Sequence, residues 1–370
     1  MREELLAKAQ ALGFDLAGIA TLGPAETAPF FDSWVDAGYA GEMAYLPKWA
    51  DKRADTRLPF PGVSSAIVVA LNYGGTQPAG PIARYARGHD YHDILIDKLN
   101  ALHAWIEETV GHKVVGKAYV DTGPILERDL ARRAGLGWFG KNTNLINPKL
   151  GSFFFIGALL VDLELEPSAP FTTDHCGTCR RCLDACPTNA LVDSHLLDAT
   201  RCISYLTIEL RGPIPEPLRP ALGELVYGCD ICQDVCPWNV RFSRDVQEPA
   251  LKAGVNPNAD TESPSLDALM GMSEDAWRTF SKGSPIKRTK RRGFLRNVAI
   301  ALGNRGSADA VPVLIDALSD VEPLVRGHAA WALGRIGTAD GLAALRARLA
   351  VEDDAMVIDE IRAALEPASL

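Results

Sequence analysis

The sequence predicts an α+β protein with a mixed α/β N-terminal domain, a central cysteine-rich segment and C-terminal α-helical repeats. Three observations predict this. Helical and strand patterns mix along residues 1–165, all eight cysteines lie within residues 176–236, and the pattern of residues 298–306 returns at 329–337. The 370 residues allow two or three domains at roughly 150 residues each. We expect the domain ranges 1–168, 169–245, 246–283 (a linker) and 284–370.

The composition is that of a globular protein. Hydrophobic residues make up 47% and charged residues 23%, which excludes collagen-like, coiled-coil and wholly disordered chains. No stretch approaches ~18 consecutive apolar residues, so we expect no membrane span. Glu3 and Glu4 stand where a signal peptide needs a basic start, so we expect a cytoplasmic location. The net charge of −9 argues against indiscriminate nucleic-acid binding but allows a local basic patch.

In the N-terminal domain, apolar periodicity predicts helices and short β-branched or aromatic runs predict strands of a sheet. The expected helices are 3–12, 29–37, 92–110 and 124–134. The expected strands are 66–71, 114–120 and 153–161.

The cysteine spacing predicts metal binding, because clustered cysteines in a cytosolic chain favour metal over disulfides. Cys176, Cys179, Cys182 and Cys186 have the bacterial ferredoxin spacing, and a proline follows the fourth. A second set is Cys202, Cys229, Cys232 and Cys236, in which Cys202 replaces a missing member from a distance. The rival is a pair of zinc sites, but zinc ribbons use separated C-x2-C pairs, so two [4Fe-4S] clusters are favoured.

In two-cluster ferredoxins the fourth cysteine of such a run ligates the other cluster. Exchanging the fourth cysteines assigns Cys176, Cys179, Cys182 and Cys236 to cluster one. Cluster two then takes Cys186, Cys202, Cys229 and Cys232. No thiol is left over, and two adjacent clusters would carry electrons one at a time.

The C-terminal pattern is a helix that ends in glycine, a short turn and a second helix, which resembles HEAT repeats with a shorter period. A basic run precedes it, with no acid between Asp275 and Asp309. Such a run is either a solvated helix face or a phosphate-binding surface. The candidate RNA-binding residues are Lys287, Arg288, Lys290, Arg291, Arg292 and Arg296.

Three features of the N-terminal domain are candidates for binding or chemistry. The glycine-rich loop 135–142 satisfies neither a dinucleotide fingerprint nor a P-loop, but it could let backbone approach a bulky ligand. Asp121, after a predicted strand, is either the N-cap of the next helix or a proton donor. Asp90 and His92 begin like the cobalamin-binding D-x-H-x-x-G pattern, but Leu95 replaces its glycine, so we expect His92 at a helix start.

Together these residues resemble the epoxyqueuosine reductases, a family of tRNA-modification enzymes. The resemblance is carried by residues 119–124 (YVDTGP), residues 137–145 (GWFGKNTNL), the cysteine array with Cys202 displaced, and the C-terminal repeats. It spans nearly the whole chain. It implies reduction of epoxyqueuosine to queuosine at the wobble position of tRNA, by electrons that pass through two [4Fe-4S] clusters to cobalamin.

The resemblance also implies site residues and partners. Asp121 matches the family's proton donor, the N-terminal domain binds cobalamin without a protein ligand to cobalt, and the glycine loop belongs to the cobalamin pocket. Further candidates for corrin contacts, placed by their proximity to the family's motifs, are Arg57, Asn144, Ser204 and Asp230. The expected partners are tRNA carrying epoxyqueuosine and an external low-potential electron donor, and the chain is expected to be a monomer. The alternatives are a corrinoid reductive dehalogenase and a non-catalytic iron–sulfur electron-transfer protein.

Overall fold

The computed structural model describes residues 1–75, 77–252 and 265–366. The chain forms two compact units, and it passes between them several times. Unit 1 comprises Met1–Pro78, Gly88–Thr200 and Asp230–Ala253, and unit 2 comprises Ala79–Arg87, Arg201–Cys229 and Gly254–Leu370. None of the helices in the described ranges is both long and apolar enough to cross a bilayer.

Unit 1 is built on an antiparallel sheet of four strands in the order β1-β2-β6-β3. Its strands are β1 (Leu16–Thr21), β2 (Ser65–Asn72), β3 (Gly116–Tyr119) and β6 (Phe154–Val161). All eight residues of β2 are buried, because helices cover both faces of this central strand. The expected strands are confirmed as β2, β3 and β6, whereas β1 was not predicted.

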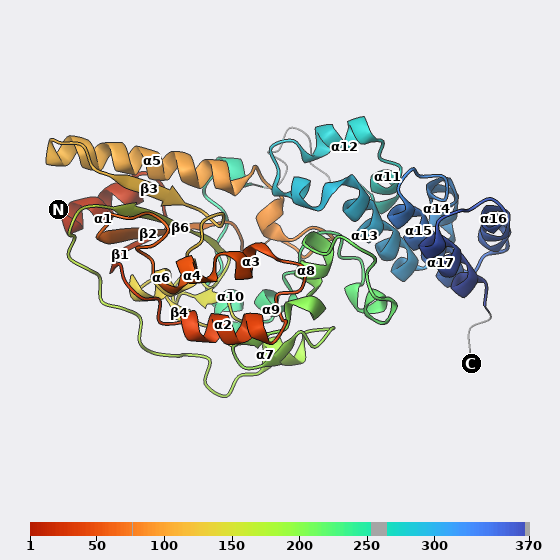
Figure 1. The fold of residues 1–370 in the computed structure, drawn as a ribbon, viewed down its shortest axis with the longest axis horizontal. Coiled ribbons are helices and arrows are strands. Elements are labelled where there is room, and N and C mark those ends of the chain that lie inside the picture. Colours follow the sequence, from red (N-terminus) through yellow and green to blue (C-terminus); the bar gives the residue numbers. More distant parts are fainter. Residues whose placement is uncertain (76, 253–264, 367–370) are drawn as a thin grey trace. The chain divides into compact units, whose positions relative to one another are not determined.

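The helices α1 (Arg2–Ala11) and α5 (Tyr91–Val110) pack on one face of the sheet, and α6 (Glu127–Arg133) packs on the other (Figure 1). On the α6 face, side chains from β2 and β6 such as Val68 and Leu160 form a core with Leu130. Burying each such aliphatic side chain contributes about 1.5–3 kcal/mol. The loop from β3 to α6 leaves the edge strand of the sheet, and it carries Asp121.

The remaining elements of unit 1 are short. The glycine loop contains β4, which pairs with β5 in a two-stranded ribbon, and β7 and β8 form another ribbon beside the cysteines. These elements are α2 (Ala28–Asp36), α3 (Tyr45–Lys48), α4 (Ala50–Ala54), β4 (Trp138–Phe139), β5 (Leu145–Ile146), α7 (Arg181–Asp184), β7 (Leu191–Asp193), β8 (Leu196–Leu197), α9 (Ile231–Asp234) and α10 (Pro237–Phe242).

Unit 2 is helical, and the predicted C-terminal repeats are confirmed. Its helices are α8 (Ile203–Ile208), α11 (Leu266–Met270), α12 (Glu274–Ser281), α13 (Lys290–Arg305), α14 (Val311–Ala317), α15 (Pro323–Ile336), α16 (Ala339–Leu349) and α17 (Ala355–Leu365). The segment expected as a linker contains α11 and α12, whose side chains Leu269, Trp277 and Phe280 are buried in the core of unit 2. These apolar residues make 265–281 part of that core.

The repeated sequence pattern has a packing reason. A Cβ on Gly303 would lie 2.9 Å from Cα of Ala332, and a Cβ on Gly334 would lie 2.8 Å from Cα of Ala364. The equivalent glycines of the two repeats therefore let α13 approach α15 and α15 approach α17. Each of the two helices α13 and α15 then ends at a glycine in the left-handed conformation, Gly306 or Gly337.

Candidate functional site

Four cysteines from distant parts of the sequence line one cavity of unit 1. Cys176, Cys179, Cys182 and Cys236 surround a space of about 250 Å³. The first three lie around α7, and Cys236 directly precedes α10. The structure thus brings together the four residues that the exchange rule assigns to cluster one.

The chemistry of this cavity fits an iron–sulfur cluster. Burial raises the pKa of the Cys182 thiol to about 11, and burial also raises the pKa values of Cys176 and Cys236. Four thiolates would repel one another here unless positive charge lay between them. The irons of a cluster supply that charge and deprotonate coordinating thiols.

Aromatic and cationic residues surround the cysteine cavity. The rings of Trp138 and Trp238 lie edge to face with centroids 5.0 Å apart. Lys141, from the glycine loop, donates hydrogen bonds from Nζ to the carbonyl oxygens of Gly177 (2.6 Å) and Cys179 (3.0 Å). The glycine loop is thereby tied to the cysteine segment.

The other four cysteines are divided between the units. Cys186 and Cys232 belong to unit 1, and Cys202 and Cys229 belong to unit 2. In unit 1, Asn142 donates a hydrogen bond from its side-chain amide to the Cys232 carbonyl at 3.3 Å. The assignment of these cysteines to cluster two stays a prediction from their spacing.

Asp121 lies in the loop between β3 and α6, and its side chain is exposed. It has φ = 59°, a left-handed conformation that few non-glycine residues adopt. Such strain is typical of functional sites. Helix α6 begins at Glu127 with Leu126 as its N-cap, so Asp121 does not cap this helix. Of the two roles considered for Asp121, the N-cap is therefore wrong.

Tyr91 donates a hydrogen bond from its hydroxyl to Oδ2 of Asp121. It is the first residue of α5, and its ring stacks on Phe155 of β6 at a centroid distance of 4.0 Å. Asp90 is the N-cap of α5 and accepts a hydrogen bond from the His92 backbone amide. The predicted place of His92 at a helix start is confirmed.

Glu127 is a second carboxyl group at the Asp121 loop. Its Oε1 is completely buried and has no hydrogen-bond partner among the described residues. Burial raises the pKa of Glu127 to about 8, and the negative charge of Asp121 adds to the rise. A carboxyl group with this pKa is mostly protonated at neutral pH.

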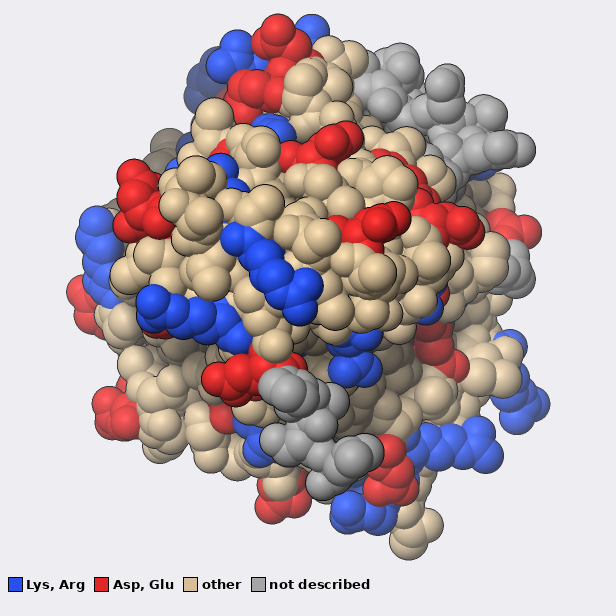
Figure 2. Space-filling model, turned by 90° about the vertical axis from the view of Figure 1, so that its right-hand side faces the viewer, with Lys and Arg blue, Asp and Glu red and all other residues tan. Residues whose placement is uncertain are grey.

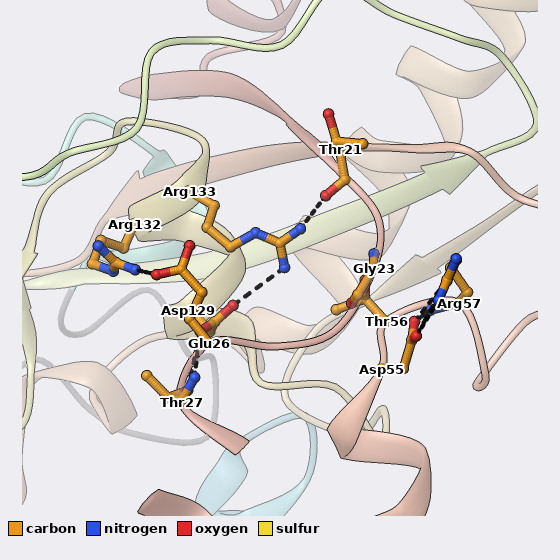
Figure 3. A network of polar contacts seen from close by, with 10 residues as sticks. All are labelled: Thr21, Gly23, Glu26, Thr27, Asp55, Thr56, Arg57, Asp129, Arg132 and Arg133. Atoms are coloured by element: carbon orange, nitrogen blue, oxygen red, sulfur yellow. Dashed lines mark hydrogen bonds and ion pairs between the residues drawn. The ribbon is translucent and has the colours of Figure 1, made fainter. Parts of the chain in front are cut away.

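Arg57 is held by its own neighbour. Its guanidinium binds the Asp55 carboxylate at 2.5 and 2.9 Å, and its side chain is 57% exposed (Figure 3). Asp129 of α6 lies apart from this pair and accepts hydrogen bonds from Thr27 and Arg133. Arg57 is exposed enough to contact a ligand, but such a ligand would compete with Asp55.

The glycine loop packs mainly on its own chain. A Cβ on Gly137 would lie 2.2 Å from the Ile146 carbonyl, and a Cβ on Gly140 would lie 2.4 Å from the Ile146 side chain. Both glycines therefore allow β4 and β5 to pair closely. Asn144 is half-buried in this ribbon and donates from its backbone amide to Asn142 Oδ1 at 3.3 Å.

The two remaining corrin candidates lie in different units. Asp230 belongs to unit 1, where it is 7% exposed and immediately precedes α9. Ser204 belongs to unit 2, in α8, and its carbonyl accepts a hydrogen bond from the Thr207 hydroxyl at 3.3 Å.

The predicted basic run in unit 2 divides into exposed and buried residues. Lys287, Arg288 and Lys290 are exposed, and Arg291 and Arg292 are half-buried. Arg288 pairs with Glu209, and Arg291 pairs with Asp320 at 2.6 Å.

Arg296 is completely buried, which corrects its assignment to an RNA-binding surface. Its guanidinium donates to the carbonyls of Leu206, Leu210 and Gly212 at 2.7–2.9 Å. Arg296 therefore stabilises the interior of unit 2 and cannot reach a ligand in solvent. On the face shown in Figure 2, Lys and Arg side chains are interspersed with Asp and Glu.

The sequence does not single out Tyr91 or Glu127, and it includes Trp138 only as part of the glycine loop. Tyr91 stands between Asp90 and His92, the two residues that begin like the D-x-H-x-x-G pattern. Glu127 lies inside a segment expected to be an ordinary helix, and no spacing rule distinguishes it. Only the fold brings these side chains to Asp121 and to the cysteine cavity.

Three family models match this chain. A model described as "Epoxyqueuosine reductase QueG, DUF1730" matches residues 53–122. The model "4Fe-4S double cluster binding domain" matches residues 175–239, and "HEAT repeats" matches residues 291–366. These matches confirm the iron–sulfur interpretation over zinc, and the repeat type.

Curated relatives match over most of the chain. It is 41% identical over 340 residues to an epoxyqueuosine reductase of Pseudomonas aeruginosa, a match that covers 88% of this chain and 92% of that protein. Relatives with the same description from Cyclobacterium marinum and Escherichia coli K12 are 43% and 39% identical, over 78% and 88% of this chain and 93% and 86% of theirs.

Solved structures also match. The epoxyqueuosine reductase of Bacillus subtilis, with its catalytic loop swung out of the active site, has a TM-score of 0.89 and 30% identity. An epoxyqueuosine reductase with an epoxyqueuosine-modified tRNA-Tyr stem loop has a TM-score of 0.87 and 31% identity. Each match covers 98% of this chain and 97% of the other.

Proposed function

The chain belongs to the epoxyqueuosine reductase family, a family of oxidoreductases, and we propose from this membership that it reduces epoxyqueuosine to queuosine at the wobble position of tRNA. The single observation in the structure that supports this most is the cavity lined by Cys176, Cys179, Cys182 and Cys236. A non-redox RNA-binding protein would have no use for it. The reaction removes an oxygen atom as water, so it needs two electrons and two protons.

In this proposal the eight cysteines hold two [4Fe-4S] clusters. Cluster one is bound by Cys176, Cys179, Cys182 and Cys236, and cluster two by Cys186, Cys202, Cys229 and Cys232. Each cluster passes one electron at a time. An external low-potential donor therefore delivers the two electrons in succession.

The Asp121 region suits a cofactor that carries out the reduction, because it combines an exposed acid, an orphaned buried oxygen of Glu127 and the apolar Tyr91–Phe155 stack. We propose cobalamin as that cofactor, with Asp121, Arg57, Asn144, Ser204 and Asp230 as candidate contacts. Cobalamin, when bound, supplies a reduced cobalt that is a strong nucleophile. No side chain is proposed as a ligand to cobalt.

Asp121 acts as the general acid. The epoxide oxygen departs as an alkoxide, which is a poor leaving group unless it is protonated. Tyr91 orients the Asp121 carboxyl group through its hydrogen bond to Oδ2.

The RNA-binding surface is proposed at the exposed residues Lys287, Arg288 and Lys290, together with the half-buried Arg291 and Arg292. Arg288 also pairs with Glu209, and Arg291 pairs with Asp320. Cationic side chains bind the phosphate backbone without reading sequence. The protein is proposed to act as a cytoplasmic monomer on tRNA.

The direct test is a deoxygenation assay. The full chain with both clusters and cobalamin is reduced anaerobically and incubated with tRNA bearing epoxyqueuosine, and the digested nucleosides are weighed. The expected result is cobalamin-dependent loss of one oxygen, which Asp121→Asn abolishes. If clusters and cobalamin are intact but no mass changes, the tRNA proposal fails and a dehalogenase-like reduction or simple electron transfer becomes the leading function.

A charge-reversal series tests the RNA-binding surface. Changing Lys287, Lys290 and Arg292 to Glu should raise the tRNA KM about 10-fold or more and reduce the dependence of affinity on salt, since three phosphate contacts are lost. The matched control changes Arg335, Arg346 and Arg362 to Glu, which alters the net charge equally on α15, α16 and α17. Equal effects of the two triple variants would exclude the proposed surface.

A further inference from the structure

The reaction proposed above requires more protons than Asp121 can hold. Converting an epoxide to an alkene breaks two C–O bonds, and the oxygen leaves as water after it has taken two electrons and two protons. A carboxyl group carries one proton at a time. A second proton must therefore reach the site during each turnover.

The structure places another carboxyl group beside Asp121. Glu127 begins α6, six positions along the chain from Asp121, and the intervening loop turns back so that the two groups interact. The Oε1 atom of Glu127 is shielded from solvent and lacks any hydrogen-bond partner among the described residues. An ionised carboxylate with a dry, unpaired oxygen is unfavourable, whereas a neutral carboxyl group tolerates that position.

The groups around Glu127 favour the neutral form overall. Burial is the largest effect and Asp121 is the next, and both raise the Glu127 pKa. The Asp121 backbone amide, Arg128 and Arg53 lower it, but they do not outweigh burial, and the resulting pKa is about 8. Arg128 donates instead to the Thr143 carbonyl, and Arg53 donates to the carbonyls of Tyr45 and Leu46.

We propose that Glu127 is the second acid of the reaction, a positioning and proton-storing residue that reprotonates Asp121 between the two C–O bond cleavages. This inference rests on the proposed function. In the first cleavage the Asp121 proton passes to the epoxide oxygen, which becomes a hydroxyl. Glu127 then gives its proton to the Asp121 carboxylate.

In the second cleavage Asp121 protonates the hydroxyl, water leaves and the double bond forms. The external donor supplies both electrons through the iron–sulfur clusters. Two protons from solvent restore Asp121 and Glu127. Atoms and charge then balance over the cycle, with one water released for two electrons and two protons consumed.

The first test is a single-turnover pH profile of the loaded, reduced protein with epoxyqueuosine tRNA. In the unmodified protein we expect the rate to fall as the pH rises through about 8, because Glu127 loses its proton. In Glu127→Gln the rate at pH 7 should fall about 10- to 100-fold, within the range of general acid catalysis, and the decline near pH 8 should disappear. The matched control is Glu26→Gln, an exposed acid paired with Arg132, which should keep both the rate and the profile.

The second test needs neither cobalamin nor tRNA. An infrared pH titration of the full chain should show a protonated carboxyl band at pH 7 that is lost above pH 8. The band should be absent from Glu127→Gln and present in Glu26→Gln. Equal iron content and thermal stability of the variants would show that the fold is intact.

These measurements separate the two proposals. If the unmodified protein makes no queuosine, the proposed function fails, and the infrared band still decides whether Glu127 holds a proton. If the unmodified protein is active and Glu127→Gln keeps its rate and pH profile, the second-acid role is overturned. An infrared spectrum without the band would overturn proton storage at Glu127 directly.

Discussion

The Tyr91 hydroxyl donates a hydrogen bond to Oδ2 of Asp121 and so joins the start of α5 to the loop after β3. The stack of Tyr91 on Phe155, with an interplanar angle of 6°, fixes the ring that carries this hydroxyl. The proposed acid thus has a left-handed backbone and one oxygen held from the neighbouring helix. Its other oxygen is not engaged by Tyr91.

Tyr91→Phe should lower kcat about 10-fold and leave the tRNA KM unchanged. The phenyl ring can still stack on Phe155, so the change removes only the hydroxyl. A hydrogen bond to a charged group is worth about 1.5–3 kcal/mol, which corresponds to about one or two orders of magnitude if it serves only the reaction. Steady-state kinetics on tRNA that carries epoxyqueuosine would measure kcat and KM separately. A raised KM with normal kcat would instead assign Tyr91 to substrate binding.

The predicted ligand sets can be tested by combining cysteine variants. Cys236→Ser should lower the iron content from about eight to about four atoms per chain, because one cluster is lost. Adding Cys176→Ser should cause no further loss, since both residues line the same cavity. Adding Cys229→Ser should remove the second cluster. Iron analysis and electron paramagnetic resonance of reduced samples measure both effects, and the opposite pattern would reverse the exchanged assignment.

Arg296→Met should destabilise the protein by about 3 kcal/mol or more. The change removes the donor from the buried Leu206 carbonyl and from the half-buried Leu210 and Gly212 carbonyls, and an unsatisfied buried group costs about 1–3 kcal/mol. Arg292→Met, on the same helix but half-buried, is the control and should change stability by less than about 1 kcal/mol. Denaturant unfolding followed by circular dichroism would compare the two. Similar midpoints would show that Arg296 is dispensable to the core.

His328 should make unit 2 sensitive to mild acid. Its Nδ1 donates to the Leu324 carbonyl at 2.8 Å, and its Nε2 accepts from the Ile214 amide at 3.3 Å, so the ring is neutral. Burial, with the charges of Arg219 and Arg296, holds the His328 pKa well below its usual value. Below pH ~6.5 His328 binds a proton in the unfolded chain but not in the folded chain. Its contribution to the free energy of unfolding is therefore complete above pH ~6.5 and is lost as the pH falls.

Protonation of His328 in the unfolded chain should therefore lower the free energy of unfolding by about 1 kcal/mol between pH 7 and pH 5.5. His328→Asn lacks the titrating ring. Between pH 7 and 5.5 its free energy of unfolding should therefore fall by about 1 kcal/mol less than that of the unmodified protein. Melting curves at the two pH values measure the difference, and the acid sensitivity of the clusters is common to both proteins. A parallel pH dependence of the two proteins would contradict the prediction.

The sequence predicted most of the sheet but missed β1. Its residues Ala17, Gly18 and Ala20 are small, so they lack the β-branched signal of a strand. The structure explains this composition, because a Cβ on Gly18 would lie 2.1 Å from the Ala134 carbonyl. The small residues allow the loop after α6 to pack closely against the strand. This contact joins segments that are distant in the sequence. A pattern along the chain therefore could not reveal it.

The candidate site was predictable where spacing encodes chemistry. Because ferredoxin ligands follow a fixed sequence rule, the cysteine spacing assigned Cys236 to the same cluster as Cys176, Cys179 and Cys182. The structure places these four residues around one cavity. Charge alone wrongly placed Arg296 on the RNA-binding surface. The mostly apolar residues around it, from Phe294 to Leu302, could have indicated that it is buried. The role of Glu127 could not be predicted from the sequence, because its environment depends on how the Asp121 loop turns back.

The order in which the ribosome makes the chain has a consequence for the cysteine cavity. Unit 1 is completed by a late stretch that begins at Asp230, so Cys236 emerges long after Cys176, Cys179 and Cys182. At about 5–20 residues per second the delay lasts several seconds. During that interval the three early thiols are open to oxidation, and an iron carrier would meet an incomplete binding site. Assembly of this protein thus depends on keeping the nascent chain reduced until its last cysteine is available.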